Sequence, residues 1–251
     1  MKTLTPNIYK LEIDITFKCT LKCFNCNRGL SIVDGREEEN MSLTQFSKFI
    51  AQSIENQHLW KQIRIMGGEP TIHPHFDEIV ERLYLYKTKF NRNLDLIVST
   101  NGKSKHTKQK IEYIKNRFPD ILIENTAKEN KYIDNFTLFH VAPKDLDMYD
   151  NHTYAGCWAT MKNGLGLNFS GFYPCSVGGS IARLFNYDIG IKNINEININ
   201  NLVRMYEQLC SLCGMYHNIK VDPDRIESVI SPSWEKLIEL LKKDKLVINR
   251  F

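Results

Sequence analysis

Three cysteines that lie close together in the chain have the spacing of a metal-cluster site. Cys19, Cys23 and Cys26 stand in the segment CTLKCFNC. Three thiolates on one loop can bind three irons of a cubane iron–sulfur cluster and leave the fourth iron free for another ligand. The alternative is a zinc site or three unrelated thiols. Because the segment has no fourth cysteine or histidine nearby, it makes a poor closed zinc site, which uses four ligands.

The other four cysteines form a second group in the later part of the chain: Cys157, Cys175, Cys210 and Cys213. Four thiolates can saturate a second cubane cluster or hold one zinc ion, and the spacing does not decide between them. Seven cysteines, in groups of three and four, suit metal binding in a reducing compartment better than a disulfide framework. We therefore expect a cytoplasmic protein.

The elements that position the first three cysteines alternate between strand and helix. Residues 9–17 alternate between apolar and polar side chains, which predicts a strand ending just before Cys19. A capping box of Ser42 and Gln45 predicts the start of a helix. Patterns of the same kind predict strands at 63–66, 94–98, 121–123 and 136–141 and helices at 42–54, 76–83 and 111–118.

This alternation predicts an α/β fold with parallel strands and right-handed crossovers. About five strands are too few to close an eight-stranded barrel, so we expect an open partial parallel β/α barrel. Ligands of such folds bind at the carboxyl ends of the strands. The cysteine loop, the GGEP segment at 67–70 and the STNG segment at 99–102 each follow a predicted strand, so they should meet at one mouth.

The later part of the chain has another organisation. Residues 164–175 predict two short strands turning at Ser170–Gly171, and the apolar spacing of 202–209 predicts a helix leading to Cys210 and Cys213. Ser231 followed by Pro232 predicts the start of a terminal helix. We therefore expect three parts: a core over 1–147, a small α+β domain over 148–220 and a helical tail over 221–251.

The order of the motifs over about the first 145 residues resembles that of radical S-adenosylmethionine (SAM) enzymes. CxxxCxxC after the first strand, GGEP after the second and STNG after the third have the order and the places of that family. The resemblance makes Cys19, Cys23 and Cys26 the catalytic centre, where they bind a 4Fe-4S cluster whose open iron chelates SAM. One electron then cleaves SAM to a 5′-deoxyadenosyl radical, which abstracts a hydrogen atom from the substrate.

The resemblance also assigns contacts to SAM. Gly67 and Gly68 let the backbone approach the methionine part, and Glu69, followed by Pro70, accepts a hydrogen bond from the ammonium group. Contacts to the ribose hydroxyls of SAM are expected from Ser99 and Asn101, and a contact to the ribose or the carboxylate is expected from Lys128.

One position departs from the family pattern. The family usually has an aromatic residue directly before the third cysteine, where it packs on the adenine side. Here Asn25 holds that place and Phe24 lies one residue earlier. We therefore assign the adenine contact to the pair Phe24 and Asn25.

The second cysteine group resembles the Twitch module of radical SAM enzymes, over about residues 150–216. The resemblance implies an auxiliary 4Fe-4S cluster, rather than zinc, held by Cys157, Cys175, Cys210 and Cys213. A saturated cluster suits electron transfer, and the pattern is similar to Twitch dehydrogenases that oxidise an aminocyclitol. We therefore expect an oxidoreductase for a small sugar, polyol or aminocyclitol-like metabolite, with a flavodoxin or ferredoxin as reductant.

Several other activities stay open. Modification of a peptide is less expected, because neither end offers a winged-helix-sized segment to grip a leader peptide. Redox-neutral radical chemistry (deoxygenation, epimerisation or decarboxylation) could begin with the same parts. A zinc-binding interaction module would leave GGEP and STNG unexplained.

Composition adds limits on the partners. The net charge of +4 is spread along 251 residues without a long run of one sign, which disfavours nucleic acid. Neither a signal peptide nor a run of eighteen apolar residues occurs, so no membrane partner is expected. The oxidation also needs a proton acceptor. The candidates by position are Arg183, Lys128, Tyr187 and His152, while His73 and His75 beside GGEP could touch SAM or substrate.

Overall fold

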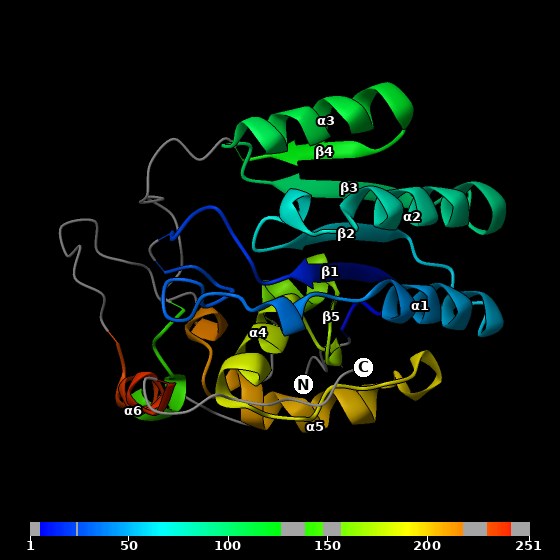
Figure 1. Cartoon of the computed structure of the whole chain (residues 1–251). Coiled ribbons are helices and arrows are strands. Elements are labelled where there is room, and N and C mark those ends of the chain that lie inside the picture. Colours follow the sequence, from blue (N-terminus) through cyan, green and yellow to red (C-terminus); the bar gives the residue numbers. More distant parts are fainter. Residues whose placement is uncertain (1–5, 24, 127–138, 148–156, 218–229, 242–251) are drawn as a thin grey trace.

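The computed structural model describes residues 6–23, 25–126, 139–147, 157–217 and 230–241. A six-stranded sheet in the order β4-β3-β2-β1-β5-β6 runs through these residues (Figure 1). Its strands are β1 (Lys10–Thr16), β2 (Gln62–Gly67), β3 (Asp95–Thr100), β4 (Leu122–Asn125), β5 (Leu165–Asn168) and β6 (Gly171–Tyr173). All neighbours pair in parallel except β5 and β6, which are antiparallel. The predicted α/β fold with an open, mainly parallel sheet is confirmed.

Helices α1 (Leu43–Glu55), α2 (Phe76–Phe90) and α3 (Lys105–Arg117) connect successive parallel strands, as the alternation predicts. The predicted capping box is present: the Ser42 hydroxyl accepts from the Gln45 amide at 3.2 Å, and the Gln45 side chain accepts from the Ser42 amide at 2.8 Å. Further helices are α4 (Ser176–Phe185), α5 (Ile199–Cys210) and α6 (Pro232–Leu241). Single turns cover Glu37–Glu39, Pro70–Ile72, Pro143–Leu146, Ala159–Asn163, Ile194–Glu196 and Gly214–His217.

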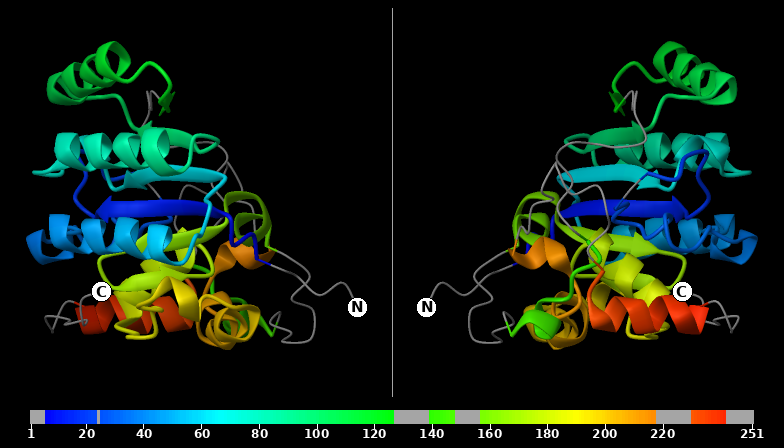
Figure 2. Two further views of the ribbon diagram at one scale, coloured as in Figure 1. Left: turned by 90° about the vertical axis from the view of Figure 1, so that its right-hand side faces the viewer. Right: turned by 90° about the vertical axis from the view of Figure 1, so that its left-hand side faces the viewer.

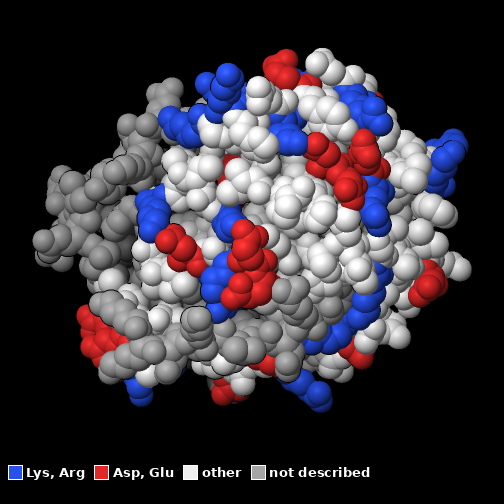
Figure 3. Space-filling view, in the orientation of Figure 1, with Lys and Arg blue, Asp and Glu red and all other residues white. Residues whose placement is uncertain are grey.

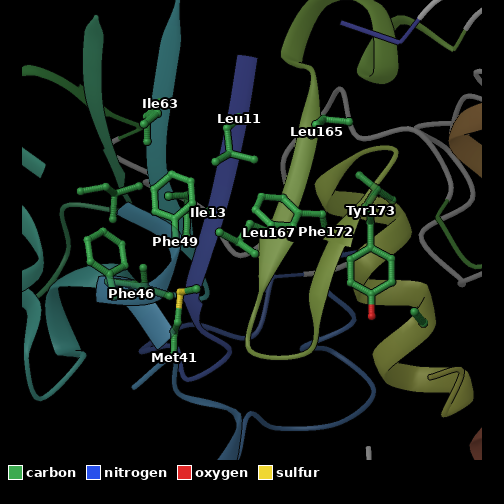
Figure 4. Close-up of a cluster of buried hydrophobic side chains, with 14 of the residues drawn as sticks. Leu11, Ile13, Met41, Phe46, Phe49, Ile63, Leu165, Leu167, Phe172 and Tyr173 are labelled. Carbon is green, nitrogen blue, oxygen red and sulfur yellow. The ribbon is translucent and has the colours of Figure 1, made fainter. Parts of the chain in front are cut away.

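The main core fills the space between one face of the sheet and the connecting helices. Leu11 and Ile13 of β1 point to this face and meet Phe46 and Phe49 of α1 (Figure 4). Leu165 and Leu167 of β5 and Phe172 of β6 continue the same apolar layer. Burial of these side chains fixes the register of the sheet, because a shift by one residue would expose the whole set.

The strand predicted at 136–141 is wrong for the residues that the structure describes, since Phe139 and His140 lie in a turn; residues 136–138 lie outside them. Here the backbone bonds to loops instead of to the sheet. The Phe139 amide donates to the Asn25 side chain at 2.8 Å, and the His140 carbonyl accepts from the Ser231 amide at 3.1 Å. The fifth parallel strand is β5, which pairs with β1.

The predicted hairpin is confirmed, with its turn one residue earlier, at Phe169–Ser170. Helix α4, which the sequence patterns did not predict, follows it and packs against β5, β6 and β1. Where α4 begins against β5, Gly166 has no room for a side chain, because a Cβ would lie 2.4 Å from the Ser176 Cα. The sheet thus continues across the boundary expected at 147–148, and the division into domains stays a prediction.

The helices lie on both sides of the sheet. In the side views α1, α2 and α3 line one side of the sheet, while α4 and α5 lie at the end of the sheet that β5 and β6 form (Figure 2). The predicted helices near residues 202–209 and from Pro232 are confirmed as α5 and α6.

No helix in the described ranges has the length and apolarity needed to span a membrane. On the face shown in Figure 3, basic and acidic side chains are interspersed.

Candidate metal and SAM site

The loop with Cys19, Cys23 and Cys26 follows β1 at the carboxyl edge of the sheet, where the strand arrowheads point (Figure 1). The Cys26 carbonyl accepts from the Gly29 amide at 2.8 Å, and the Cys19 sulfur accepts from the Leu21 amide at 3.4 Å. Burial raises the pKa of the Cys19 thiol, the Leu21 amide opposes the rise, and the negative charges of Cys26, Glu69 and Cys23 add to it, which together bring the pKa to about 11. Three mutually repelling thiolates in a half-buried loop fit a cationic group such as an iron cluster.

The GGEP segment lies against the start of the cysteine loop. The Gly68 amide donates to the Thr16 carbonyl at 2.9 Å, and the Glu69 amide donates to the Lys18 carbonyl at 2.8 Å. Gly67 has a φ of +138°, and a Cβ there would lie 2.1 Å from the Thr16 oxygen. The glycines are therefore required for the close approach of β2 to the cysteine loop, whatever they contact in SAM.

The carboxylate of Glu69 joins GGEP to STNG. Its Oε1 accepts from the Thr71 hydroxyl at 2.7 Å and the Thr100 hydroxyl at 2.8 Å, and its Oε2 accepts from the Asn101 amide at 2.7 Å. The residue is fully buried. Oε1 is saturated by these donors and the Thr71 amide, whereas Oε2 keeps acceptor capacity for a further donor.

The two residues predicted to contact the ribose differ in their surroundings. The Asn101 side chain donates to the Thr20 hydroxyl at 3.1 Å and to the Cys19 sulfur at 3.8 Å, so it orients the cysteine loop. The Ser99 hydroxyl, near the end of β3, donates to Glu124 at 2.8 Å. Their contacts to SAM, and that of Pro70 at the start of its single turn, stay predictions.

Asn25 has a structural reason for standing where an aromatic is usual. It adopts a φ of 54°, in the left-handed region that asparagine tolerates better than most residues. It is buried, and its side-chain oxygen accepts from the Phe139 amide. Asn25 thus ties the cysteine loop to the segment after the fourth strand. Phe24 and Lys128 lie outside the described residues.

The second cysteine group lies around a single cavity. Cys157, Cys175, Cys210 and Cys213 all line it, and it holds about 340 Å³ of space free of protein atoms, part of it open to solvent. The remaining lining is mostly apolar, with Val177, Gly178, Ile181, Leu209 and Met215 among it. The hairpin, α4 and α5, with the chain at 157, bring together four cysteines that are up to 56 residues apart in sequence.

Charge and burial at this cavity fit a bound cationic group. Burial raises the pKa of Cys175 to about 12, and Cys157 adds to the rise. The pKa of Cys210 is raised by burial and by the charges of Cys175, Cys213 and Cys157. Four thiolates would be unstable here without a metal centre to compensate them. Among the described residues, no three His, Cys, Asp or Glu side chains are spaced for a single metal ion.

A buried polar group between the two cysteine sets was missed from sequence. Arg28 is 3% exposed and pairs with Asp14 at 3.1 Å, while Glu12 is 4% exposed and pairs with Arg64 at 2.8 Å. Glu12 and Asp14 occupy the polar side of the alternation in β1, which a one-sided sheet would expose to water. The burial of Glu12 and Asp14 could have been predicted from the central position of β1, because a strand in the middle of a parallel sheet is covered on both faces.

The candidate proton acceptors are not supported where the structure describes them. Arg183 is 2% exposed and forms a bidentate pair with Glu39 at 2.9 and 3.0 Å, so it clamps α4 to the segment that follows the cysteine loop. Tyr187 stacks on Phe185. His152 and Lys128 lie outside the described residues.

The two histidines beside GGEP are not equivalent. His73 is buried, with Nε2 bonded to the Met41 carbonyl at 3.0 Å and Nδ1 accepting from the His75 amide at 3.0 Å. Its ring is therefore used to hold the loop. His75 is half exposed and lies 3.7 Å from Glu78.

Residues 13–123 match the model of the radical SAM superfamily. This chain carries a radical SAM domain. The match includes the cysteine loop, GGEP and STNG, so the three motifs belong to the same domain. The predicted resemblance to the radical SAM superfamily is confirmed over these residues, and that family uses SAM and a 4Fe-4S cluster.

Curated relatives are similar over a shorter stretch. A probable GTP 3′,8-cyclase of Methanococcus maripaludis is 34% identical over 98 residues, which are 38% of this chain and 29% of the relative. A GTP 3′,8-cyclase of Helicobacter pylori is 29% identical over 92 residues, 37% of this chain and 27% of the relative. The chain thus spans under a third of the length of these relatives.

Two solved structures are similar at a low level. One is the crystal structure of BtrN in complex with AdoMet and 2-DOIA, with a TM-score of 0.46, 15% identity and coverage of 86% of this chain and 90% of that chain. The other is BtrN in an open conformation, with a TM-score of 0.42 and 14% identity, covering 86% of this chain and 89% of that chain.

Proposed function

We propose that this protein is a two-cluster radical SAM oxidoreductase that removes two electrons from a small polar metabolite. The observation that carries the proposal is the convergence of Cys157, Cys175, Cys210 and Cys213 on one cavity beside the radical SAM domain. Four ligands leave no site on a bound cluster for substrate, so electron transfer is the role that fits.

The residues of the first site have separate tasks. Cys19, Cys23 and Cys26 hold the cluster, and Gly67, Gly68 and Glu69 place the methionine part of SAM, with Glu69 Oε2 as acceptor for its ammonium group. Ser99 and Asn101 are assigned to the ribose and Lys128 to the ribose or carboxylate, and the adenine contact is assigned to Phe24 and Asn25. When bound, the SAM-binding cluster would supply the electron that cleaves SAM to methionine and the 5′-deoxyadenosyl radical, and the auxiliary cluster would accept one electron from the substrate radical.

The proposed reaction balances for oxidation of a secondary alcohol. The C–H hydrogen atom goes to the 5′-carbon of the deoxyadenosyl radical, and the hydroxyl proton goes to an acceptor. The remaining electron goes to the auxiliary site, which leaves a ketone. A sugar, polyol or aminocyclitol is the expected substrate class, and a flavodoxin or ferredoxin the expected electron donor for the first site.

The test is the iron, sulfide and zinc content after anaerobic reconstitution, together with reductive SAM cleavage. We expect about eight irons in the wild type. Replacing Cys19, Cys23 and Cys26 with Ala should remove about four irons and abolish SAM cleavage. Replacing Cys210 and Cys213 with Ala should remove the other four irons but leave uncoupled SAM cleavage.

Two outcomes would change the proposal. About four irons with one zinc would make the second site structural and favour redox-neutral radical chemistry. SAM cleavage that survives in the triple variant would contradict the first assignment. GTP is not proposed as substrate, because the similarity covers only 29% of the first of those relatives.

A further inference from the structure

Buried charges connect the two cysteine sets through the interior of the protein. Arg28 lies two residues after Cys26, and its guanidinium donates to Asp14 at 3.1 Å and lies 3.8 Å from the Glu12 carboxylate. The Arg28 side chain is 4% exposed and that of Asp14 is 1% exposed. Bulk water therefore does not screen these charges.

Glu12 continues the connection to the second cysteine set. Its Oε2 accepts from the hydroxyl of Ser176, the residue next to Cys175, and its Oε1 accepts from Arg64 at 2.8 Å. Cys175 caps α4, with its sulfur accepting from the Gly178 amide at 3.2 Å. A continuous path thus runs from Cys26 through Arg28, Glu12 and Ser176 to Cys175.

This path places the negative charge of Glu12 and the positive charge of Arg28 at different positions along the connection to the second site. Glu12 is one hydrogen bond from the residue beside Cys175, while Arg28 reaches the second site only through its pairing with Glu12 and follows Cys26 by two residues. A buried carboxylate opposes the addition of an electron to a neighbouring metal centre, and a buried cation favours it. The two side chains should therefore act in opposite directions on any redox centre held by Cys175.

We propose that Glu12 lowers and Arg28 raises the reduction potential of the auxiliary cluster, and so act as positioning residues that set it as the electron acceptor. This rests on the proposed function, since it needs an auxiliary cluster. Arg28 is also close enough to Cys26 for their charges to interact, so its charge acts on both sites, whereas Glu12 acts mainly on the second. Neither residue needs to touch the substrate for this role.

The test is a redox titration followed by EPR on the reconstituted full-length protein. Glu12→Gln keeps the shape and an acceptor for Ser176, and Arg28 and Arg64 each keep one carboxylate partner, Asp14 and Glu124. We expect the auxiliary signal to be reduced about tenfold more readily in Glu12→Gln, a positive shift of about 59 mV for a one-electron couple. Arg28→Gln should shift it the other way, and Arg28→Lys should stay close to the wild type.

A matched control separates charge from burial. Glu39 is also buried, with 1% of its surface exposed, and it pairs with Arg183 instead of with Arg28. Glu39→Gln should therefore change the potential of the auxiliary site much less than Glu12→Gln. If Arg28→Gln fails to fold, the double variant Asp14→Asn/Arg28→Gln removes the buried pair together.

Each outcome is decisive. Unchanged potentials in Glu12→Gln, or shifts of the same size in Glu39→Gln, would overturn this inference while two EPR signals still support the proposed function. A wild type without an auxiliary iron signal would overturn both. Opposite shifts of the potential in Glu12→Gln and Arg28→Gln would support the inference, because a purely structural role does not predict potential shifts of opposite sign.

Discussion

The Glu69 carboxylate accepts a hydrogen bond from the Asn101 amide at 2.7 Å across two loops that are 32 residues apart in sequence. Together with the Thr100 hydroxyl on its other oxygen, this bond holds the ends of β2 and β3 at a fixed spacing. Asn101 in turn reaches the cysteine loop through Thr20. The three motifs of the radical SAM domain are therefore one hydrogen-bonded unit, even without SAM.

Glu69→Gln should destabilise this unit. The amide NH₂ would face a backbone donor at the place of one carboxylate oxygen, so we expect a loss of about 2–3 kcal/mol in the free energy of unfolding. Urea denaturation measures it, and SAM binding should weaken as well. Thr100→Val removes one of the four donors and should cost about 1 kcal/mol. A Gln variant as stable as the wild type would contradict the role of Glu69 in linking the ends of β2 and β3.

Asn25 offers a test of the departure from the family pattern. Asn25→Gly permits the φ of 54° but leaves the buried Phe139 amide without its acceptor, at about 1–3 kcal/mol. Asn25→Phe loses the acceptor and adds strain in the left-handed region, so it should cost more than Asn25→Gly. Thermal or urea unfolding of both variants checks the order. A Phe variant that is more stable than the Gly variant would contradict the structural role of Asn25.

Arg183 should behave as a clamp and not as a base. Arg183→Met leaves Glu39 buried with Arg36 as its remaining partner, and we expect a loss of about 3 kcal/mol in stability, with easier loss of iron from the first site. Arg183→Lys keeps the positive charge and should therefore retain part of the stability that Arg183→Met loses. The pH profile of product formation should be unchanged in the Lys variant. A profile that moves with the side chain would instead return Arg183 to the candidate bases.

His73 predicts a pH dependence of stability. Burial lowers the pKa of His73 to about 4, below the unfolded value near 6.5, and the hydrogen bond to the Met41 carbonyl only partly opposes this shift. The unfolded chain then binds more protons between these values, so stability is complete above about pH 6.5 and falls as pH decreases toward 4. At pH 5.5 the loss is about 1 kcal/mol relative to pH 7.5.

His73→Gln keeps a donor for the Met41 carbonyl without a titrating group. Its unfolding free energy should therefore change less between pH 7.5 and 5.5 than that of the wild type, measured by urea denaturation at both values. His140, which is also buried with a lowered pKa, is present in both proteins and cancels in the comparison. Equal changes in the two proteins would contradict a neutral His73.

Local patterns in the sequence determined much of this protein. Period-two alternation placed β1, helical spacing with a capping box placed α1, and parallel strands require the residues after β1, β2 and β3 to meet at one edge. The cysteine spacing and the two motifs after the strands therefore defined the radical SAM domain without a structure. These features depend on residues within a few positions of one another, so sequence alone is sufficient for them.

Only the tertiary structure decided the partners of these elements. The pattern at 136–141 is apolar enough for a strand, but the place beside β1 is taken by β5, and the backbone at Phe139 and His140 bonds to Asn25 and Ser231 instead. The link from Glu12 to Ser176 spans 164 residues. Pairings of this kind follow from the assembly of the whole sheet and the burial of both its faces, which no local pattern records.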